Sequence, residues 1–210
     1  WLEQHGQDVI AIKAGDEFRK IAQNTYSINP QRHDDYHTLL GELDQSNQQP
    51  SKVLHCWSVT PAKRTSSLLA SVNRSQDLGL YSLLFLAQSF GQRQVVHPVD
   101  ILVVSNHIQE VTGEEVLAPE KATVLGACKI IPLEYTNLTC CCVDITPESA
   151  ESLESKLIDA LFAEITQPSD QVTAYRGTHR WVPCFEPVRL EKLNEITSRL
   201  RQGGVYLITG

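Results

Sequence analysis

Polar side chains that could do chemistry follow an apolar stretch at residues 99–106, VDILVVSN. This stretch is β-branched and apolar without alternation, as expected of a parallel strand buried on both faces. Ser105 stands near its end, and the loop after it carries possible acids at Glu110, Glu114 and Glu115. Ligands of open α/β sheets bind at the carboxyl ends of the strands, so any chemistry would lie in this loop. A solvated loop edge is the favoured interpretation of the three glutamates.

The loop leads into EKATVLGACKIIPLEY, whose apolar residues recur at helical spacing. Strand, loop and helix together resemble the second half of a short-chain dehydrogenase/reductase. That family has a Ser after the strand and a Tyr four residues before a Lys at the helix start. Ser105 and Lys121 match the Ser and the Lys, but Leu117 occupies the Tyr position. Leucine has no proton to donate to a carbonyl oxygen, so the family's general acid is absent and no catalytic residue is predicted.

A wider set of sequence blocks resembles the non-catalytic structural subdomain of a ketoreductase from a modular type I polyketide synthase. In chain order the blocks are DLGLYSLLFLAQSFG, VTGEEVLAPEKATVLGACKIIPLEY, YRGTHRWVPCFEPVRL and GGVYLITG. The resemblance implies a scaffold that braces the NADPH-binding half of a multidomain, cytoplasmic oxidoreductase of polyketide biosynthesis. That half would reduce a β-ketoacyl thioester carried on an acyl carrier protein. The implied partners are therefore the catalytic subdomain of the same polypeptide and the acyl carrier protein.

Cofactor binding is not predicted for the chain alone. A dinucleotide needs a glycine-rich turn after the first strand, where backbone N–H groups meet the pyrophosphate. No such turn follows the apolar AIK, where Gly15 stands alone. The end of the chain, Thr209-Gly210, looks like the opening of a TGxxGxxG turn. The resemblance thus implies a structural subdomain over residues 1–202 and the truncated first strand of the catalytic subdomain over 203–210, with Thr209 and Gly210 as NADPH neighbours in the parent enzyme.

Two other functions stay open. The chain could be a free-standing, atypical reductase that uses Ser105, Lys121 and a proton donor other than Leu117. It could also be a docking module for a carrier protein, whose acidic helix and phosphopantetheine call for a basic patch. Hints of such a patch are Lys63 with Arg64 and Arg176 with Arg180.

Rings and cations crowd a predicted hairpin around Gly177-Thr178. Such amphipathic side chains are typical of interface anchors, and an interface is favoured over a strand packed on its own sheet. The residues concerned are Tyr175, Arg176, His179, Arg180, Trp181 and Phe185.

Composition excludes several classes of protein. The formal net charge is -7 and the basic residues are scattered, which argues against a nucleic-acid surface. No apolar run is long enough for a membrane span, and no signal peptide opens the chain. The six cysteines show neither a disulfide framework nor metal-ligand spacing, so small apolar filler in a reducing cytosol is favoured. His55 and Cys56 are adjacent strand residues that point to opposite faces, which favours a core role over a nucleophile pair.

Alternating strands and helices predict an α/β fold, a truncated Rossmann-like domain with a mainly parallel sheet flanked by helices. A polar surface excursion is predicted over residues 61–76, before a helix that Asp77 caps and Gly91 closes. The predicted strands cover residues 8–14, 52–59, 99–106, 136–146, 172–177, 179–188 and 205–209. The predicted helices cover residues 17–23, 32–45, 77–91, 120–135, 149–165 and 190–203.

One strand of this predicted sheet is not accounted for. In a Rossmann-type sheet the first strand lies centrally, here between residues 9–13 and 53–59, and it would precede Trp1. An empty position would leave two strands without ladder partners, and each buried unpaired backbone group costs roughly 1–3 kcal/mol. We expect either that residues 205–209 fill the position in parallel or that other polypeptide supplies the strand.

Overall fold

A computed structural model of the chain describes residues 2–60, 67–146, 151–167, 169–189 and 203–209. Its larger sheet has five strands in the order β4-β5-β6-β7-β8. The first four are parallel, and only the last pairing is antiparallel. The predicted α/β, truncated Rossmann-like fold with a mainly parallel sheet is confirmed. The strands are β4 (Lys52–Ser58), β5 (Val99–Asn106), β6 (Leu138–Ile145), β7 (Val172–Arg176) and β8 (His179–Trp181).

A smaller sheet of three strands precedes it, in the order β1 (Ala11–Ala14), β3 (Thr25–Ile28), β2 (Arg19–Ala22). The predicted helix over residues 17–23 is therefore wrong. Its sequence has helix-forming residues, but Lys20 lies over the ring of Tyr26 at 5.3 Å and Phe18 stacks on the same ring at 6.1 Å. Pairing with the buried β3 overrides the local propensity.

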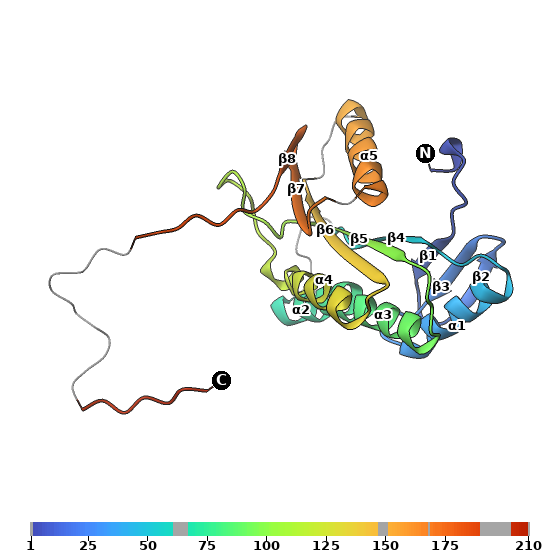
Figure 1. Cartoon of the computed structure of the whole chain (residues 1–210), viewed down its shortest axis with the longest axis horizontal. Coiled ribbons are helices and arrows are strands. Elements are labelled where there is room, and N and C mark those ends of the chain that lie inside the picture. The colour runs from blue at the N-terminus through green and yellow to red at the C-terminus, as the bar shows by residue number, and fades with distance from the viewer. Residues whose placement is uncertain (1, 61–66, 147–150, 168, 190–202, 210) are drawn as a thin grey trace.

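Helices cover both faces of the larger sheet. Figure 1 shows α3 and α4 on one face and α5 on the other. The helices are η1 (Glu3–His5), α1 (His33–Gln45), α2 (Leu68–Ser75), η2 (Gln76–Tyr81), α3 (Ser82–Gln92), η3 (Pro119–Lys121), α4 (Thr123–Glu134) and α5 (Glu151–Thr166). The predicted helix at residues 190–203 lies almost wholly outside the described residues.

The predicted surface excursion at 61–76 is partly wrong, because its second half forms α2. A π-helical turn, η2, joins α2 directly to α3, so Asp77 lies inside a continuous helix and caps nothing. Gly91 likewise lies within α3 rather than after it. The turn is close to α4: a Cβ on Gly79 would come within 2.8 Å of the Val124 Cγ1, which explains a glycine there.

The main hydrophobic core joins the two sheets. One cluster of buried residues includes Tyr26 and Ile28 of β3, Ile101 and Val103 of β5, and side chains of α1, α3 and α4. A second, smaller cluster lies on the opposite face of the larger sheet under α5, where Leu157 and Leu161 pack against it. The two sheets therefore share one helical layer and belong to one hydrophobic unit.

Residues 9–13 and 53–59 do not pair directly with each other in the described part of the chain, as expected. Among the described residues, β1 pairs only with β3 and β4 pairs only with β5, so neither strand has a partner on its other side. The first of the two expected outcomes, residues 205–209 as a strand between β1 and β4, is wrong, because these residues lie in no strand. The second outcome, a strand from other polypeptide, stays a prediction. Val205, Leu207 and Ile208 are 96%, 91% and 91% exposed. No helix in the described part of the chain is long and apolar enough to cross a membrane.

Candidate functional site

Ser105 and Lys121 both lie at the carboxyl end of β5, but neither is available to a substrate. Ser105 is fully buried, and its Oγ has no hydrogen-bond partner among the described residues. Lys121 is also buried, and its Nζ donates to the side-chain Oδ1 of Asn106 and, at 3.3 Å, to the backbone oxygen of that residue. Burial lowers the pKa of Lys121, against the opposing charges of Asp144 and Glu120. Lys121 is therefore a structural side chain that ties η3 to β5.

Leu117, at the position of the family's tyrosine, is 41% exposed in the loop after β5. The next residue, Ala118, donates its N–H to the His107 oxygen at 2.7 Å and closes the loop on itself. An alternative proton donor, Tyr175, donates instead to the carboxylate of Glu164 at 2.7 Å. The absence of a general acid stays a prediction from the sequence.

Asn106 is a site residue that the sequence analysis missed. It is fully buried, donates its Nδ2 to the Thr60 oxygen at 2.8 Å and accepts from the Thr60 N–H at 3.2 Å. These bonds join the end of β5 to the chain that leaves β4. Asn106 follows Ser105 in the VVSN stretch, and a polar residue at the end of an apolar strand was the available signal.

Arg176 at the end of β7 fastens the loop after β5. Its Nη2 donates to the Asp144 Oδ2 and to the Gln109 oxygen, both at 2.7 Å, and its Nε donates to the Glu115 Oε1 at 3.0 Å. Asp144 is fully buried and also accepts the N–H groups of Ile108 at 3.1 Å and Gln109 at 3.2 Å. The carboxyl edge is thus filled by ion pairs and loop backbone.

Glu115 is not a solvated loop residue, so that interpretation is wrong for it. Its carboxylate accepts the N–H groups of Val111, Thr112 and Gly113 at distances of 2.9–3.2 Å, in addition to the Arg176 bond. The Thr112 backbone bond, followed by the Arg176 bond, lowers the pKa of this carboxyl well below its usual range. Glu110 and Glu114 are exposed, as expected.

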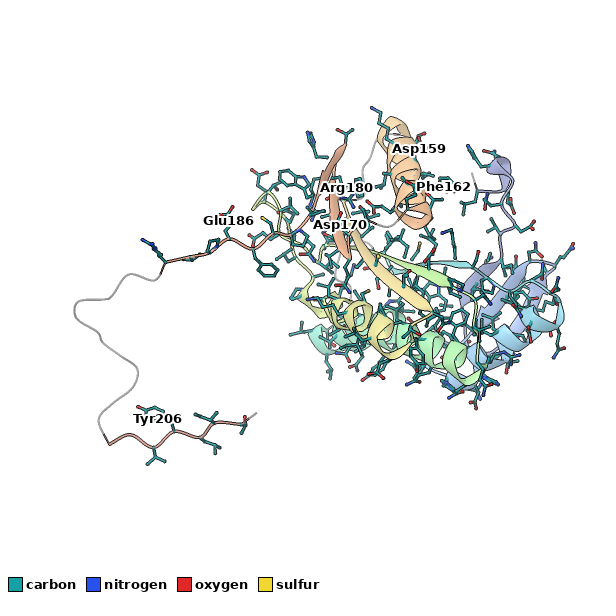
Figure 2. All side chains as sticks on the ribbon, viewed as in Figure 1. Asp159, Phe162, Asp170, Arg180, Glu186 and Tyr206 are labelled. Atoms are coloured by element: carbon teal, nitrogen blue, oxygen red, sulfur yellow. The ribbon has the colours of Figure 1, made fainter. Side chains whose placement is uncertain are left out.

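Tyr175, Arg176 and Arg180 of the hairpin serve the fold itself. Arg180 donates to Glu164 at 2.6 Å and lies 2.9 Å from the Asp170 carboxylate. Figure 2 labels Arg180 and Asp170, which lie near α5. Arg176 is neutralised by two carboxylates in the same way. His179, Trp181 and Phe185 are exposed, and the exposed fraction of Phe185 is 102%. The interface prediction therefore keeps only these three residues, and Arg176 with Arg180 offers no unpaired positive patch.

The remaining candidates are core residues except Cys56, for which the predicted core role is wrong. His55 is buried with its Nε2 2.8 Å from the Ser82 Oγ, and burial lowers its pKa to about 4. Cys56, the next residue, is exposed on the other face of β4. Cys128, Cys140 and Cys142 lie together in the main core, where the Cys128 hydrogen bond and burial raise the pKa of Cys140. Within the described ranges, no group of three or more His, Cys, Asp and Glu residues could hold a metal ion.

Close packing of β1 on β3 accounts for Gly15. A Cβ on Gly15 would come within 2.1 Å of the Ser27 Oγ, so this glycine allows β1 and β3 to pack closely and does not open a phosphate cradle. Thr209 is exposed and in no strand, and Gly210 lies outside the described residues. The hollow lined by His33, Phe85, Gln88, Gly91, Gln92 and Tyr135 lies over the helices and away from Ser105.

The family model described as beta-ketoacyl synthase-like, N-terminal, matches residues 2–164. The chain belongs to this family. None of the curated proteins compared with the chain matches it.

Solved structures with the same fold include two ketoreductases. One is an adenylation, ketoreductase and pseudo Asub multidomain structure of a keto acid-selecting NRPS module, with 26% identity and a TM-score of 0.77 over 85% of this chain. Another is an N-terminal ketoreductase from the macrolactin assembly line, with 22% identity and a TM-score of 0.65 over 83% of this chain. A third, 4-hydroxyisoleucine dehydrogenase complexed with NADH, has 13% identity and a TM-score of 0.53 over 81% of this chain and 97% of its own.

The chain spans only 15% and 34% of the lengths of the two ketoreductase chains. The predicted resemblance to the structural subdomain of a ketoreductase is confirmed by these matches together with the family. At the carboxyl edge, where such folds bind ligands, this chain has a buried serine, an anchored lysine and a loop held by Arg176.

Proposed function

We propose that this chain is the non-catalytic, structural half of a ketoreductase and that it braces a catalytic half in the same polypeptide. The observation that carries the proposal is that the side chains at the carboxyl edge of the larger sheet are buried or bonded within the fold. Leu117 has no proton to donate, the Lys121 ammonium is hydrogen-bonded to Asn106, and Ser105 is buried. The ion pairs of Arg176 use this edge to stiffen the fold, which suits a scaffold.

In this proposal residues 1–202 form the scaffold and residues 203–210 begin the catalytic subdomain. Thr209 and Gly210 would then neighbour NADPH only in the parent enzyme, where the rest of the glycine-rich turn completes the pyrophosphate site. The parent would reduce a β-ketoacyl thioester on an acyl carrier protein. The ketoreductases of similar fold support a reductase activity for the parent enzyme. The similar dehydrogenase complexed with NADH supports a nicotinamide cofactor for it.

The two rival functions have weaker support. A free-standing reductase would need a proton donor beside Ser105, and Tyr175 is already bonded to Glu164. A carrier-protein docking module would need unpaired basic residues, yet Arg176 and Arg180 each have two carboxylate partners. Lys63 and Arg64 lie outside the described residues.

We expect the isolated chain neither to bind NADPH tightly nor to oxidise it, because it has no complete glycine-rich turn. Titration with NADPH should leave the intrinsic tryptophan fluorescence and the calorimetric heat unchanged. The parent polypeptide, with the sequence after Gly210 restored, is the control and should bind the cofactor. Low-micromolar binding by the isolated chain would contradict the scaffold proposal.

Restoring the missing acid should not restore turnover. In Leu117→Tyr the phenol returns, but the hydride donor still has no pocket that holds it near a carbonyl carbon, and positioning supplies much of the rate. Reduction of a model ketone, followed by NADPH absorbance, should not exceed that of the unaltered chain. Leu117→Phe is the matched control because it adds the ring without the hydroxyl. NADPH-dependent reduction by the tyrosine variant alone would show an intact site.

A further inference from the structure

The loop after β5 contains hydrogen-bond donors that converge on one point. The backbone N–H groups of three successive residues, Val111, Thr112 and Gly113, donate to the Glu115 carboxylate at 2.9–3.2 Å. The φ angle of Gly113 is 85°, in the left-handed region that glycine adopts without strain. Successive N–H groups that turn toward a common centre form an anion-binding concavity, or nest. The loop therefore supplies a nest at the carboxyl edge of the larger sheet.

The Arg176 guanidinium forms the other side of this nest, and groups other than Glu115 largely fix its position. Its Nε donates to the Glu115 Oε1 at 3.0 Å. Its Nη1 donates to the Tyr175 oxygen at 3.0 Å, and its Nη2 donates to the Gln109 oxygen and the Asp144 carboxylate, both at 2.7 Å. We therefore expect the Nε–H to keep its direction when the Glu115 carboxylate leaves.

Glu115 belongs to an exposed stretch of the loop. Its own side chain is only 10% exposed, whereas Thr112, Gly113, Glu114 and Val116 are all exposed. The exposed fraction of Val116 reaches 79%. Because packing holds these neighbours weakly, the carboxylate is the main attachment of the stretch. Glu115 thus occupies the nest in the manner of a tethered ligand.

The donors suit a carboxylate better than a more highly charged anion. A carboxylate offers two oxygens in one plane with about four lone-pair sites. Here Oε1 accepts bonds from Val111, Thr112 and Arg176. Oε2 accepts bonds from Thr112 and Gly113. The Arg176 charge is shared with Asp144, whose Oδ2 lies 2.7 Å from Nη2, so a second negative charge on a ligand would be repelled.

We propose that the N–H groups of Val111, Thr112 and Gly113 and the Nε–H of Arg176 form a binding site for a monocarboxylate, with Glu115 as a resident occupant that an external carboxylate displaces. A small organic acid and the side chain of an acidic peptide present the same two oxygens. The tether keeps Glu115 at a high local concentration, so an external carboxylate must compete with it. The inference goes beyond the proposed function and does not depend on it.

Glu115→Ala tests the site because it removes the occupant and leaves every donor in place. The amides of Val111, Thr112 and Gly113 should exchange with solvent at least about tenfold faster than in the unaltered chain, and sodium acetate should slow them again. Acetamide is the matched control ligand, since it has the same shape without the charge, and sodium chloride controls for ionic strength. Glu114→Ala is the matched control variant and should change neither the exchange nor the response to acetate.

The unaltered chain shows whether Glu115 can be displaced. Acetate should shift the NMR resonances of the same three amides, with an apparent Kd at least about tenfold higher than in Glu115→Ala, because the tethered carboxylate competes. The peptide acetyl-Ala-Glu-Ala-amide, with its glutamine counterpart as control, separates the two sources of ligand. Tighter binding of the glutamate peptide than of acetate would assign the site to an acidic segment of a protein. Equal or weaker binding would assign it to a small organic acid.

Two results would overturn the proposal. In Glu115→Ala, protection that acetate does not restore, or that acetamide or chloride restores equally well, would show that the donors do not form a carboxylate site. In the unaltered chain, amide resonances that stay unchanged up to about 1 M acetate would show that Glu115 is a permanent structural contact. If far-UV circular dichroism shows that Glu115→Ala does not fold, Glu115→Gln replaces it. Acetate should displace the neutral glutamine at a lower concentration than it displaces Glu115, and equal concentrations would contradict the proposal.

Discussion

Arg176→Met should destabilise the fold by about 3–5 kcal/mol, the range expected when one partner of a buried ion pair is removed. The reason is Asp144, which is fully buried and 2.7 Å from the Arg176 guanidinium. Methionine keeps much of the apolar length of the side chain and removes its charge, so a buried carboxylate is left with only backbone donors. Urea unfolding, followed by tryptophan fluorescence, measures the change in the free energy of unfolding.

Arg19→Met is the matched control. Its partner Glu17 is as close, at 2.6 Å, but the two side chains are 68% and 59% exposed. An exposed pair contributes about 0–1 kcal/mol, so this variant should unfold almost as the unaltered chain does. Equal losses in the two variants would show that burial of Asp144 does not matter. The loop after β5 should also lose protection from amide exchange in Arg176→Met alone, because that loop is bonded to the guanidinium.

Acid should weaken the fold through His55 at pH values above the ordinary carboxyl range. Burial lowers the pKa of His55 from 6.5 to about 4, so between these values the unfolded chain binds a proton that the folded chain does not. Stability from this group is therefore complete above pH 6.5 and falls as the pH drops toward 4. The difference in pKa predicts a loss of about 2 kcal/mol between pH 7 and pH 4.5.

The measurement is urea unfolding at several pH values across this window, with the Trp57 ring 5.5 Å from the imidazole as a local fluorescent probe. His55→Gln is the matched variant, since the amide can still bond the Ser82 hydroxyl but does not titrate. It should show a nearly flat dependence from pH 7 to pH 4.5. A variant that keeps the full pH dependence would mean that another group is responsible.

Much of the larger sheet could be predicted from the sequence because its signals are local. The stretch VDILVVSN, apolar without alternation, predicts a strand buried on both faces. The strand β5 occupies that same range. The hairpin of β7 and β8 followed from Gly177, whose φ of 58° suits the turn.

Other features could not be predicted because their partners are distant in sequence. Arg176 and Glu115 are 61 residues apart, and nothing near either residue indicates the ion pair. The strand β2 has helix-forming residues and becomes a strand only because β3 pairs with it. The helix α2 was missed because its exposed Leu68 and Leu69, 65% and 69% exposed, do not form a buried stripe.

The outer edges of the two sheets differ from the inner ones in a way that limits self-assembly. The outer edge strand β2 carries Arg19 and Lys20, and β8 is three residues long and is followed closely by Pro183. Charged side chains, short strands and proline all discourage further pairing. The outer edges of both sheets are therefore poor templates for edge-to-edge association with another molecule.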